Sequence, residues 1–146
     1  MWKFEHTLEA ELTCEQVWSI WTDVNNWSTW DPSVAWAKLV GKFEVGSTFI
    51  LKPKDGPKVH SVIRQCKPCE GFTNSARLPL CELVFDHRVI EVDGRVKITH
   101  GASLTGLTEF IFRRVIGRQI ERDIPVAMAS LIERVRSMKR ETVSQP

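Results

Sequence analysis

The stretch EQVWSIWTDVNNWSTWDP, residues 15–32, is the most informative about the fold, because it contains most of one helix, the signals that end it, and four of the chain's six tryptophans. Just before it, Thr13 is followed three residues later by Gln16, which is the capping-box pattern of a helix N-terminus. Apolar residues then recur at helical spacing. The pattern predicts a helix over about 14–24.

A second, shorter helical turn follows, in which NWSTW carries Trp27 and Trp30 on the same side before Pro32 forbids continuation. An indole offers a large rigid apolar surface with one N–H donor. Trp27 and Trp30 are therefore candidates to line the mouth of a cavity and contact a ligand. The alternative is that they only seal the short helix against a sheet. Trp18 and Trp21 belong to the preceding helix, and we expect them to have a packing role.

Seven strands are predicted around this helical stretch. Residues 2–12 alternate between apolar and polar side chains, which indicates a strand with one buried face. From residue 34 onward, short apolar runs alternate with turn signals such as Asp93-Gly94, a hairpin pair. These runs predict six further strands, at 34–43, 47–54, 58–66, 71–80, 81–93 and 95–104. Because the separators are short, an antiparallel meander is the simplest topology.

The C-terminal part of the chain has helical periodicity nearly to its end, either as one long helix or as two collinear pieces. An interior proline removes a backbone hydrogen bond, so we expect a kink near Ile124, just before Pro125. The last residues are polar and are expected to fray. We expect one domain over residues 1–140 and a polar tail over 141–146. The apolar stripe consists of Phe112, Ile116, Ile120, Ile124, Ala127, Leu131, Val135 and Met138.

This order of elements predicts an α+β fold in which a curved seven-stranded antiparallel sheet wraps around the long C-terminal helix. The length of 146 residues is sufficient for a core without disulfides or metals. A single helix cannot completely fill so curved a sheet. A cavity between sheet and helix is expected, with the short helices and hairpin loops at its mouth.

The charge and hydropathy patterns argue against nucleic acid as a partner and against stable membrane insertion. The formal net charge is +2, and basic and acidic residues are mixed along the chain without a basic stripe, so nucleic acid is not an expected partner. The first residues lack the layout of a signal peptide, and no stretch approaches a membrane span. We therefore expect a cytoplasmic protein without stable membrane insertion. The oligomeric state is left open.

The chain resembles the START/Bet v 1-like superfamily with its helix-grip fold, in particular the SRPBCC branch labelled polyketide cyclase/dehydrase. The motif that carries this resemblance lies in residues 15–32. It consists of a helix with a valine-tryptophan pair, then Thr-Asp, then two tryptophans three residues apart before Asp-Pro. GKFEVGSTFIL at 41–51 and VKITHGASLTG at 96–106 also match this branch. The resemblance covers essentially the whole chain and implies fold rather than function, because the superfamily includes carriers, aromatase/cyclases and partner-binding domains. The matching residues are Val17, Trp18, Thr22, Asp23, Trp27, Trp30, Asp31 and Pro32.

Strand parity places two histidines on the inner face of the predicted sheet. His87 shares its parity with Leu83, Phe85 and Val89, and His100 shares its parity with the apolar residues of the next strand. The Asp-Gly turn joins these strands, so both imidazoles could lie on one cavity wall. Buried histidines can move protons or orient a carbonyl, although satisfied core histidines are commoner. His6 and His60 show no such grouping and are expected to be structural or exposed.

Other inward positions are candidate ligand contacts, and each could equally be simple core. Asn74 could provide one amide in the pocket. No confident catalytic residue emerges, because GxSxG, P-loop, GxGxxG and HExxH motifs are absent. The candidate ligand-binding residues are Trp27, Trp30, Phe49, Leu51, Asn74, Phe85, His87, Ile98, His100, Ile111 and Met128.

The cysteines include the sequence Cys66-Lys67-Pro68-Cys69, with Cys81 further on. A zinc site would need a fourth ligand at matching spacing, and there is no second CxxC. A thioredoxin-like site places CxxC at a helix N-terminus, whereas this one lies in a predicted hairpin turn. We therefore expect free thiols, no metal and no cofactor.

The leading functional hypothesis is the binding of a small hydrophobic molecule, such as a lipid, polyketide, isoprenoid or aromatic metabolite, between the sheet and the C-terminal helix. One alternative is a polyketide cyclase or dehydratase that uses His87 and His100 as acid and base. Another is a protein-interaction domain in which exposed aromatic and arginine side chains matter and the cavity is incidental.

Overall fold

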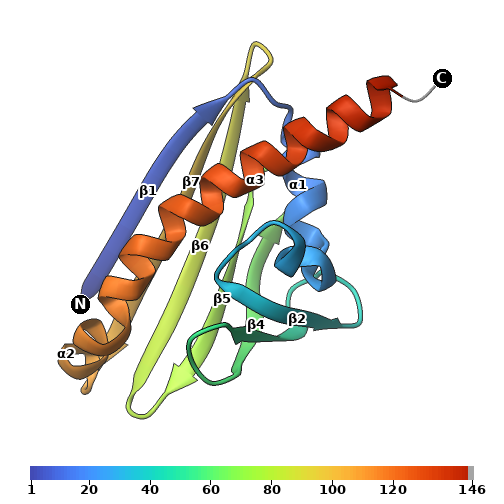
Figure 1. Ribbon diagram of the computed structural model, residues 1–146. Coiled ribbons are helices and arrows are strands. Elements are labelled where there is room, and N and C mark those ends of the chain that lie inside the picture. Colours follow the sequence, from blue (N-terminus) through green and yellow to red (C-terminus); the bar gives the residue numbers. More distant parts are fainter. Residues whose placement is uncertain (145–146) are drawn as a thin grey trace.

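A computed structural model describes residues 1–144, with side chains to residue 139. It contains one seven-stranded antiparallel sheet in the order β1-β7-β6-β5-β4-β3-β2 (Figure 1). This order confirms the predicted meander and adds that the first strand pairs with the last. The strands are β1 (Trp2–Ala10), β2 (Val34–Val40), β3 (Thr48–Pro53), β4 (Val59–Lys67), β5 (Gly71–Leu78), β6 (Cys81–Val92) and β7 (Arg95–Gly106).

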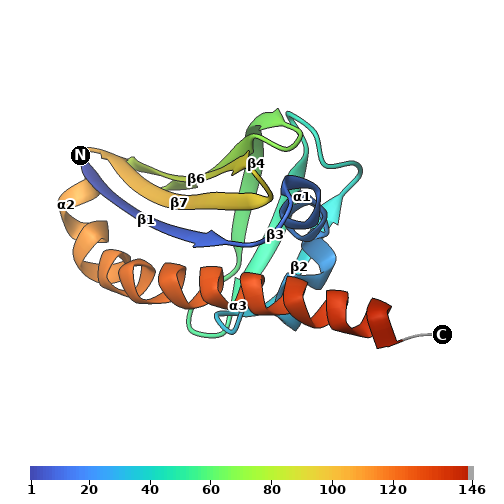
Figure 2. The ribbon, with the colours of Figure 1, turned by 90° about the horizontal axis from the view of Figure 1, so that it is seen from above.

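The sheet curves strongly, and the long C-terminal helix α3 (Arg118–Ser144) runs along its concave side (Figure 2). Seen from above, β1, β7 and β6 form one wing, and β4, β3 and β2 turn away from it toward the helix. This arrangement confirms the predicted α+β architecture of a sheet wrapped around one helix. The concave face and α3 therefore enclose the interior of the protein.

The tryptophan-rich stretch forms two short helices at one end of the sheet, α1 (Cys14–Thr22) and the 3-10 helix η1 (Val24–Thr29). The predicted capping box is present: the Gln16 N–H donates to Thr13 Oγ1 at 3.2 Å, and the Thr13 N–H donates to Gln16 Oε1 at 2.9 Å. Val24, predicted to end the first helix, instead begins the second. The N-terminal cap thus fixes where the chain leaves β1 and enters the helical segment.

The C-terminal helical region begins with α2 (Glu109–Phe112) and a π-helical segment, η2 (Arg113–Gly117), before α3. The helix α3 continues through Pro125 without a break, and the kink expected near Ile124 stays a prediction. The proline leaves the carbonyl of Glu121 without its helical donor, and Glu121 is exposed, so water can replace that bond. Residues 141–144 of the predicted tail are helical, 145–146 lie outside the described residues, and the division at residue 140 stays a prediction.

The main core unites the two short helices, the sheet and the middle of α3. Val17, Trp21 and Trp27 meet Phe49 and Phe72 from the sheet, and the helix contributes its stripe from Ile124 onward. A smaller cluster lies at the other end, where Cys81, Leu83 and Leu104 pack below α2 and the start of α3. Trp2, Phe85 and Ile120 contact both clusters and are only partly buried. The concave face between the two clusters positions the candidate site.

Candidate ligand-binding site

Three histidines lie side by side across neighbouring strands on the concave face. The register places His87 of β6 opposite His100 of β7, and His100 opposite His6 of β1. Directly opposite residues in an antiparallel pair point to the same face. The inward orientation that parity predicts for His87 and His100 agrees with this register, whereas the expectation that His6 stands apart from them does not.

The rings of His87 and His100 are in close contact with each other and with aromatic side chains. The His87 and His100 ring centroids are 4.1 Å apart, and Phe72 stacks on His87 at 3.9 Å with an interplanar angle of 7°. Trp21 of α1 approaches His87 edge-on at 5.5 Å, and Phe85 approaches His100 at 6.0 Å. The two imidazoles are therefore surrounded by aromatic side chains that shield them from water.

Burial determines the protonation of both imidazoles. Desolvation lowers the pKa of His100 to about 4. The pKa of His87 also falls well below its ordinary value, chiefly through desolvation and further through repulsion from His100, although a hydrogen bond with the Phe72 backbone opposes the shift. Both rings are neutral at physiological pH. A neutral imidazole offers one N–H donor and one acceptor nitrogen, so the pair is suited to orienting a polar group.

Three buried polar atoms on this face have no hydrogen-bond partner among the described residues: Asn74 Oδ1, His87 Nδ1 and His100 Nε2. Asn74 lies on β5 opposite Phe85, and its Nδ2 reaches Ser61 Oγ only at 3.4 Å. Buried polar atoms are normally paired with protein or ordered water. Their concentration on three adjacent strands marks the part of the interior best able to receive a polar group from outside the chain.

The tryptophans of the helical segment are positioned mainly by packing. The Trp27 indole donates to the backbone oxygen of Trp21 at 3.1 Å, and its ring lies 5.3 Å from that of Phe49. The N–H donor of Trp27 is thus already used within the chain. Trp30 is partly buried and packs against the main core. For Trp27 the structure adds a well-defined packing role to the predicted ligand contact.

The predicted ligand contacts separate into three groups. Asn74, Phe85, His87 and His100 meet on the central strands. Ile111 lies on α2 and is 46% exposed, away from this group. The ligand-contact roles of the whole set stay predictions. The remaining positions pack in or against the main core: Trp27, Trp30, Phe49, Leu51, Ile98 and Met128.

A small pocket of about 160 Å³ lies at the rim, between the loop after η1, the β3–β4 loop and α3. Burial raises the pKa of Asp123 in this pocket and that of the neighbouring Asp31, although hydrogen bonds from Ser33 oppose the shift of Asp31. None of the predicted ligand contacts lines it. Its walls are Pro32, Ser33, Lys54, Asp55, Gln119, Asp123 and Val126.

Two features of the site were missed from the sequence. His6 has the inward parity of β1, but its place beside His100 depends on the pairing of β1 with β7. Ser61 has the inward parity of β4, and its contact with Asn74 depends on a register that shifts at an irregularity after Ile63. The alternation of side chains along each strand indicates that both residues face inward. Which strand each one lies beside could not be obtained from that alternation.

Solved structures share this architecture at low sequence identity. Ara h 8.0201 aligns with a TM-score of 0.74 at 12% identity, over 93% of this chain and 98% of that one. The Zhui aromatase/cyclase from Streptomyces gives 0.72 at 14%, over 92% and 93%. Norcoclaurine synthase from Thalictrum flavum gives 0.68 at 11%, over 92% and 85%. The curved sheet, its helix and these likenesses define a Bet v 1-like helix-grip fold.

The chain belongs to the family described as polyketide cyclase / dehydrase and lipid transport, whose model matches residues 1–138. No curated protein sequence matches the chain significantly. Among the described helices, none combines the length and the apolar character needed to cross a bilayer. Family membership supports a ligand-binding or cyclase role for the chain.

Proposed function

We propose that this protein binds a small hydrophobic molecule bearing a carbonyl or hydroxyl group, held between the concave face of the sheet and α3. The observation that carries the proposal is the group of unpartnered polar atoms of Asn74, His87 and His100 on three adjacent strands. Leaving a buried polar atom unpaired costs about 1–3 kcal/mol. A ligand with one polar group would recover part of this cost.

Incomplete packing around these atoms supports the same conclusion. Phe85 and His100 lie in the middle of long central strands and point toward the interior, yet both retain accessible surface. Phe85 packs against both apolar clusters without belonging to the buried part of either one. An apolar molecule at this position would cover surface that the chain itself leaves uncovered, and each buried methylene would add about 0.8 kcal/mol.

We infer that access to this position involves movement of the chain. Binding pockets for small organic molecules usually measure about 300–1,000 Å³. The rim pocket between α3 and the β3–β4 loop is smaller, at about 160 Å³, and is lined by none of the predicted ligand contacts. The π-helical segment of residues 113–117 interrupts regular hydrogen bonding just before α3, and such segments are frequent at functional sites. We place the opening movement at the junction of η2 and α3.

Titration with prodan, a neutral naphthalene ketone whose fluorescence shifts in apolar surroundings, tests the proposal. We expect wild type to bind one prodan per chain. His100→Phe keeps a flat ring but removes a hydrogen-bonding nitrogen, so its affinity should fall about fivefold, the equivalent of one neutral hydrogen bond. His60→Gln is the matched control, because His60 is exposed on β4. Absence of saturable binding, or equal loss in both variants, would contradict the proposal.

A cyclase or dehydratase activity is the second candidate, and the contact between the rings of His87 and His100 at 4.1 Å favours it. The low pKa of His100 weighs against a role as a general acid at neutral pH, because that role needs a bound proton to give. The discriminating assay incubates the protein with a linear poly-β-ketone thioester and follows cyclisation with loss of water by mass. Turnover that His100→Phe abolishes while prodan still binds would establish the enzyme.

A further inference from the structure

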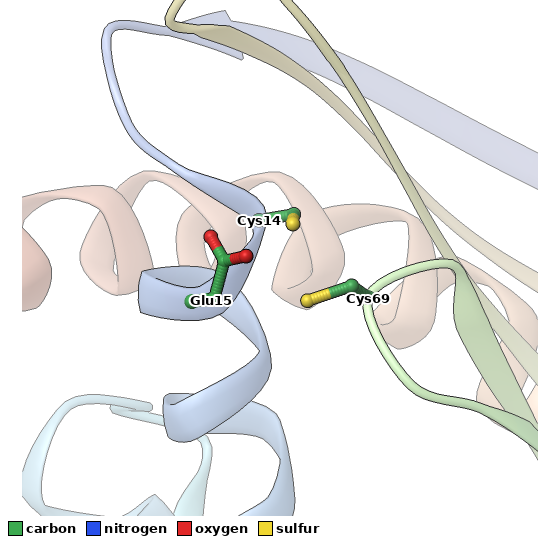
Figure 3. Close-up of side chains that lie close together, drawn as sticks. All are labelled: Cys14, Glu15 and Cys69. Atoms are coloured by element: carbon green, nitrogen blue, oxygen red, sulfur yellow. The ribbon is translucent and has the colours of Figure 1, made fainter.

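We propose that Cys14, Glu15 and Cys69 form a binding site for one thiophilic divalent cation, with Zn²⁺ as the expected ion. One ligand atom from each residue, two sulfurs and a carboxylate oxygen, lies within 4.8 Å of the other two. Cys14 and Glu15 lie on α1, and the Cys69 thiol is directed toward them from a separate segment (Figure 3). This site is independent of the ligand proposed for the concave face.

The distances suit a tetrahedral ion after a small adjustment. Zinc–sulfur bonds of about 2.3 Å place two sulfurs of a tetrahedral site roughly 3.8 Å apart, and zinc–oxygen bonds are about 2.0–2.2 Å. Atoms already within 4.8 Å of one another need to approach by roughly an ångström or less, which rotation of the side chains can supply. Three protein ligands leave the fourth position for water.

The backbone on both sides of the site is well anchored. Cys14 and Glu15 occupy the first turn of α1 behind its capping box, and the Cys14 N–H donates to Glu91 Oε1 at 2.6 Å. Cys69 lies in the turn between β4 and β5 with a φ of 60°, and the Glu70 N–H closes this turn on the Lys67 oxygen at 3.0 Å. The ligands are thus presented by two fixed elements rather than by mobile loops.

The ligand chemistry selects the class of ion. Thiolate ligands favour zinc and other soft or borderline metals, whereas Mg²⁺ and Ca²⁺ prefer shells made entirely of oxygen. The two cysteines are partly buried and Glu15 is exposed, so an ion can reach the cluster from solvent. With both thiols deprotonated the three ligands carry three negative charges, and a divalent cation offsets most of that repulsion.

A disulfide between Cys14 and Cys69 would use the same two sulfurs. The carboxylate of Glu15 has no part in a disulfide. The three-ligand arrangement therefore favours a cation over a redox bond.

This trio differs from the CxxC grouping considered in the sequence. Cys66 is on β4, where it packs against the main core, while Cys69 faces α1. A bound cation would join α1, which carries Trp21, to the turn that leads into Phe72. Both aromatic side chains contact His87. Occupancy of the site would therefore stiffen one wall of the histidine row.

Titration with Co²⁺ and then Zn²⁺ tests the site in the full chain, kept reduced with a phosphine under nitrogen. Wild type should take up one Co²⁺ with a thiolate charge-transfer band in the near ultraviolet, and one equivalent of Zn²⁺ should remove the band. Cys14→Ser and Cys69→Ser should each lose the band. Cys66→Ser and Cys81→Ser are matched controls that should retain it.

Glu15→Gln provides a second measurement that leaves both thiols in place, at an exposed position where folding is not at risk. Its Zn²⁺ affinity should fall by at least the roughly 10- to 100-fold seen when outer-shell partners of metal ligands are removed. No band in wild type, a band retained without Cys14 or Cys69, or wild-type affinity in Glu15→Gln would overturn the proposal. So would zinc-free protein with a Cys14–Cys69 disulfide when it is purified without reductant.

Discussion

The substitution His100→Phe is expected to reduce the loss of stability that the protein undergoes in mild acid. His100 lies on the concave face against His87, and desolvation lowers its pKa to about 4 from an ordinary value of 6.5. Between these two values the unfolded chain binds a proton that the folded chain does not. Folding stability contributed by neutral His100 is therefore complete above pH 6.5 and is lost as pH falls toward 4.

The size of this effect follows from the two pKa values. With 6.5 for the unfolded chain and about 4 for the folded one, His100 alone lowers the free energy of unfolding by about 2 kcal/mol between pH 7 and pH 5. His87 acts with the same sign, because its pKa is also lowered. Asp31 and Asp123 act oppositely, since burial raises their pKa and so favours the folded state in acid. Both carboxyl groups are present in wild type and variant, so their contribution cancels in the comparison.

Urea denaturation of wild type and variant at pH 7 and pH 5 measures this difference directly. The relevant quantity is the change between the two pH values within each protein, so any fixed cost of the substitution cancels. His100→Phe should lose about 2 kcal/mol less than wild type over this interval, and the exposed-histidine control His60→Gln should behave like wild type. An unchanged pH dependence in His100→Phe would refute a desolvated, neutral His100.

Three further substitutions test how the site is positioned. Thr13→Ala removes the side-chain acceptor at the start of α1 and should cost about 1 kcal/mol in urea denaturation; no loss would contradict a stabilising cap. Trp27→Phe removes the hydrogen bond to the Trp21 oxygen and should cost about 1–3 kcal/mol, measured in the same way, because a buried acceptor is left unpaired; wild-type stability would show that this bond contributes nothing. Gly71→Ala would bring a Cβ within 2.2 Å of the His87 oxygen, so we expect a large drop in melting temperature and an altered near-ultraviolet circular dichroism spectrum, and wild-type behaviour would mean that the strands separate easily.

The sequence was sufficient for the pairing of the two central histidines. Asp93 and Gly94 form a tight turn with positive φ at both positions, so each residue of β6 pairs with the residue of β7 equally distant from the turn. His87 and His100 satisfy this relation. Alternation alone then placed both side chains on the inner face. The turn geometry and the alternation of side chains were sufficient, because His87 and His100 belong to the same hairpin.

Contacts between distant segments could not be obtained in this way. His6 joins the histidine row only because β1 pairs with β7, and Cys14 meets Cys69 only because α1 packs beside the β4–β5 turn. The path of α3 through Pro125 is also a tertiary effect, since Ile124 and Met128 on either side of it are buried in the same core. Packing there outweighs the local preference of proline to break a helix.

Native mass spectrometry of the full chain, followed by extraction and identification of any bound molecule, is the most direct test of ligand binding. We expect one apolar small molecule per chain, bearing a carbonyl or hydroxyl group, that is released when the protein unfolds. A bare protein whose melting temperature is also unchanged by a panel of lipids, polyketides and aromatic metabolites would contradict it.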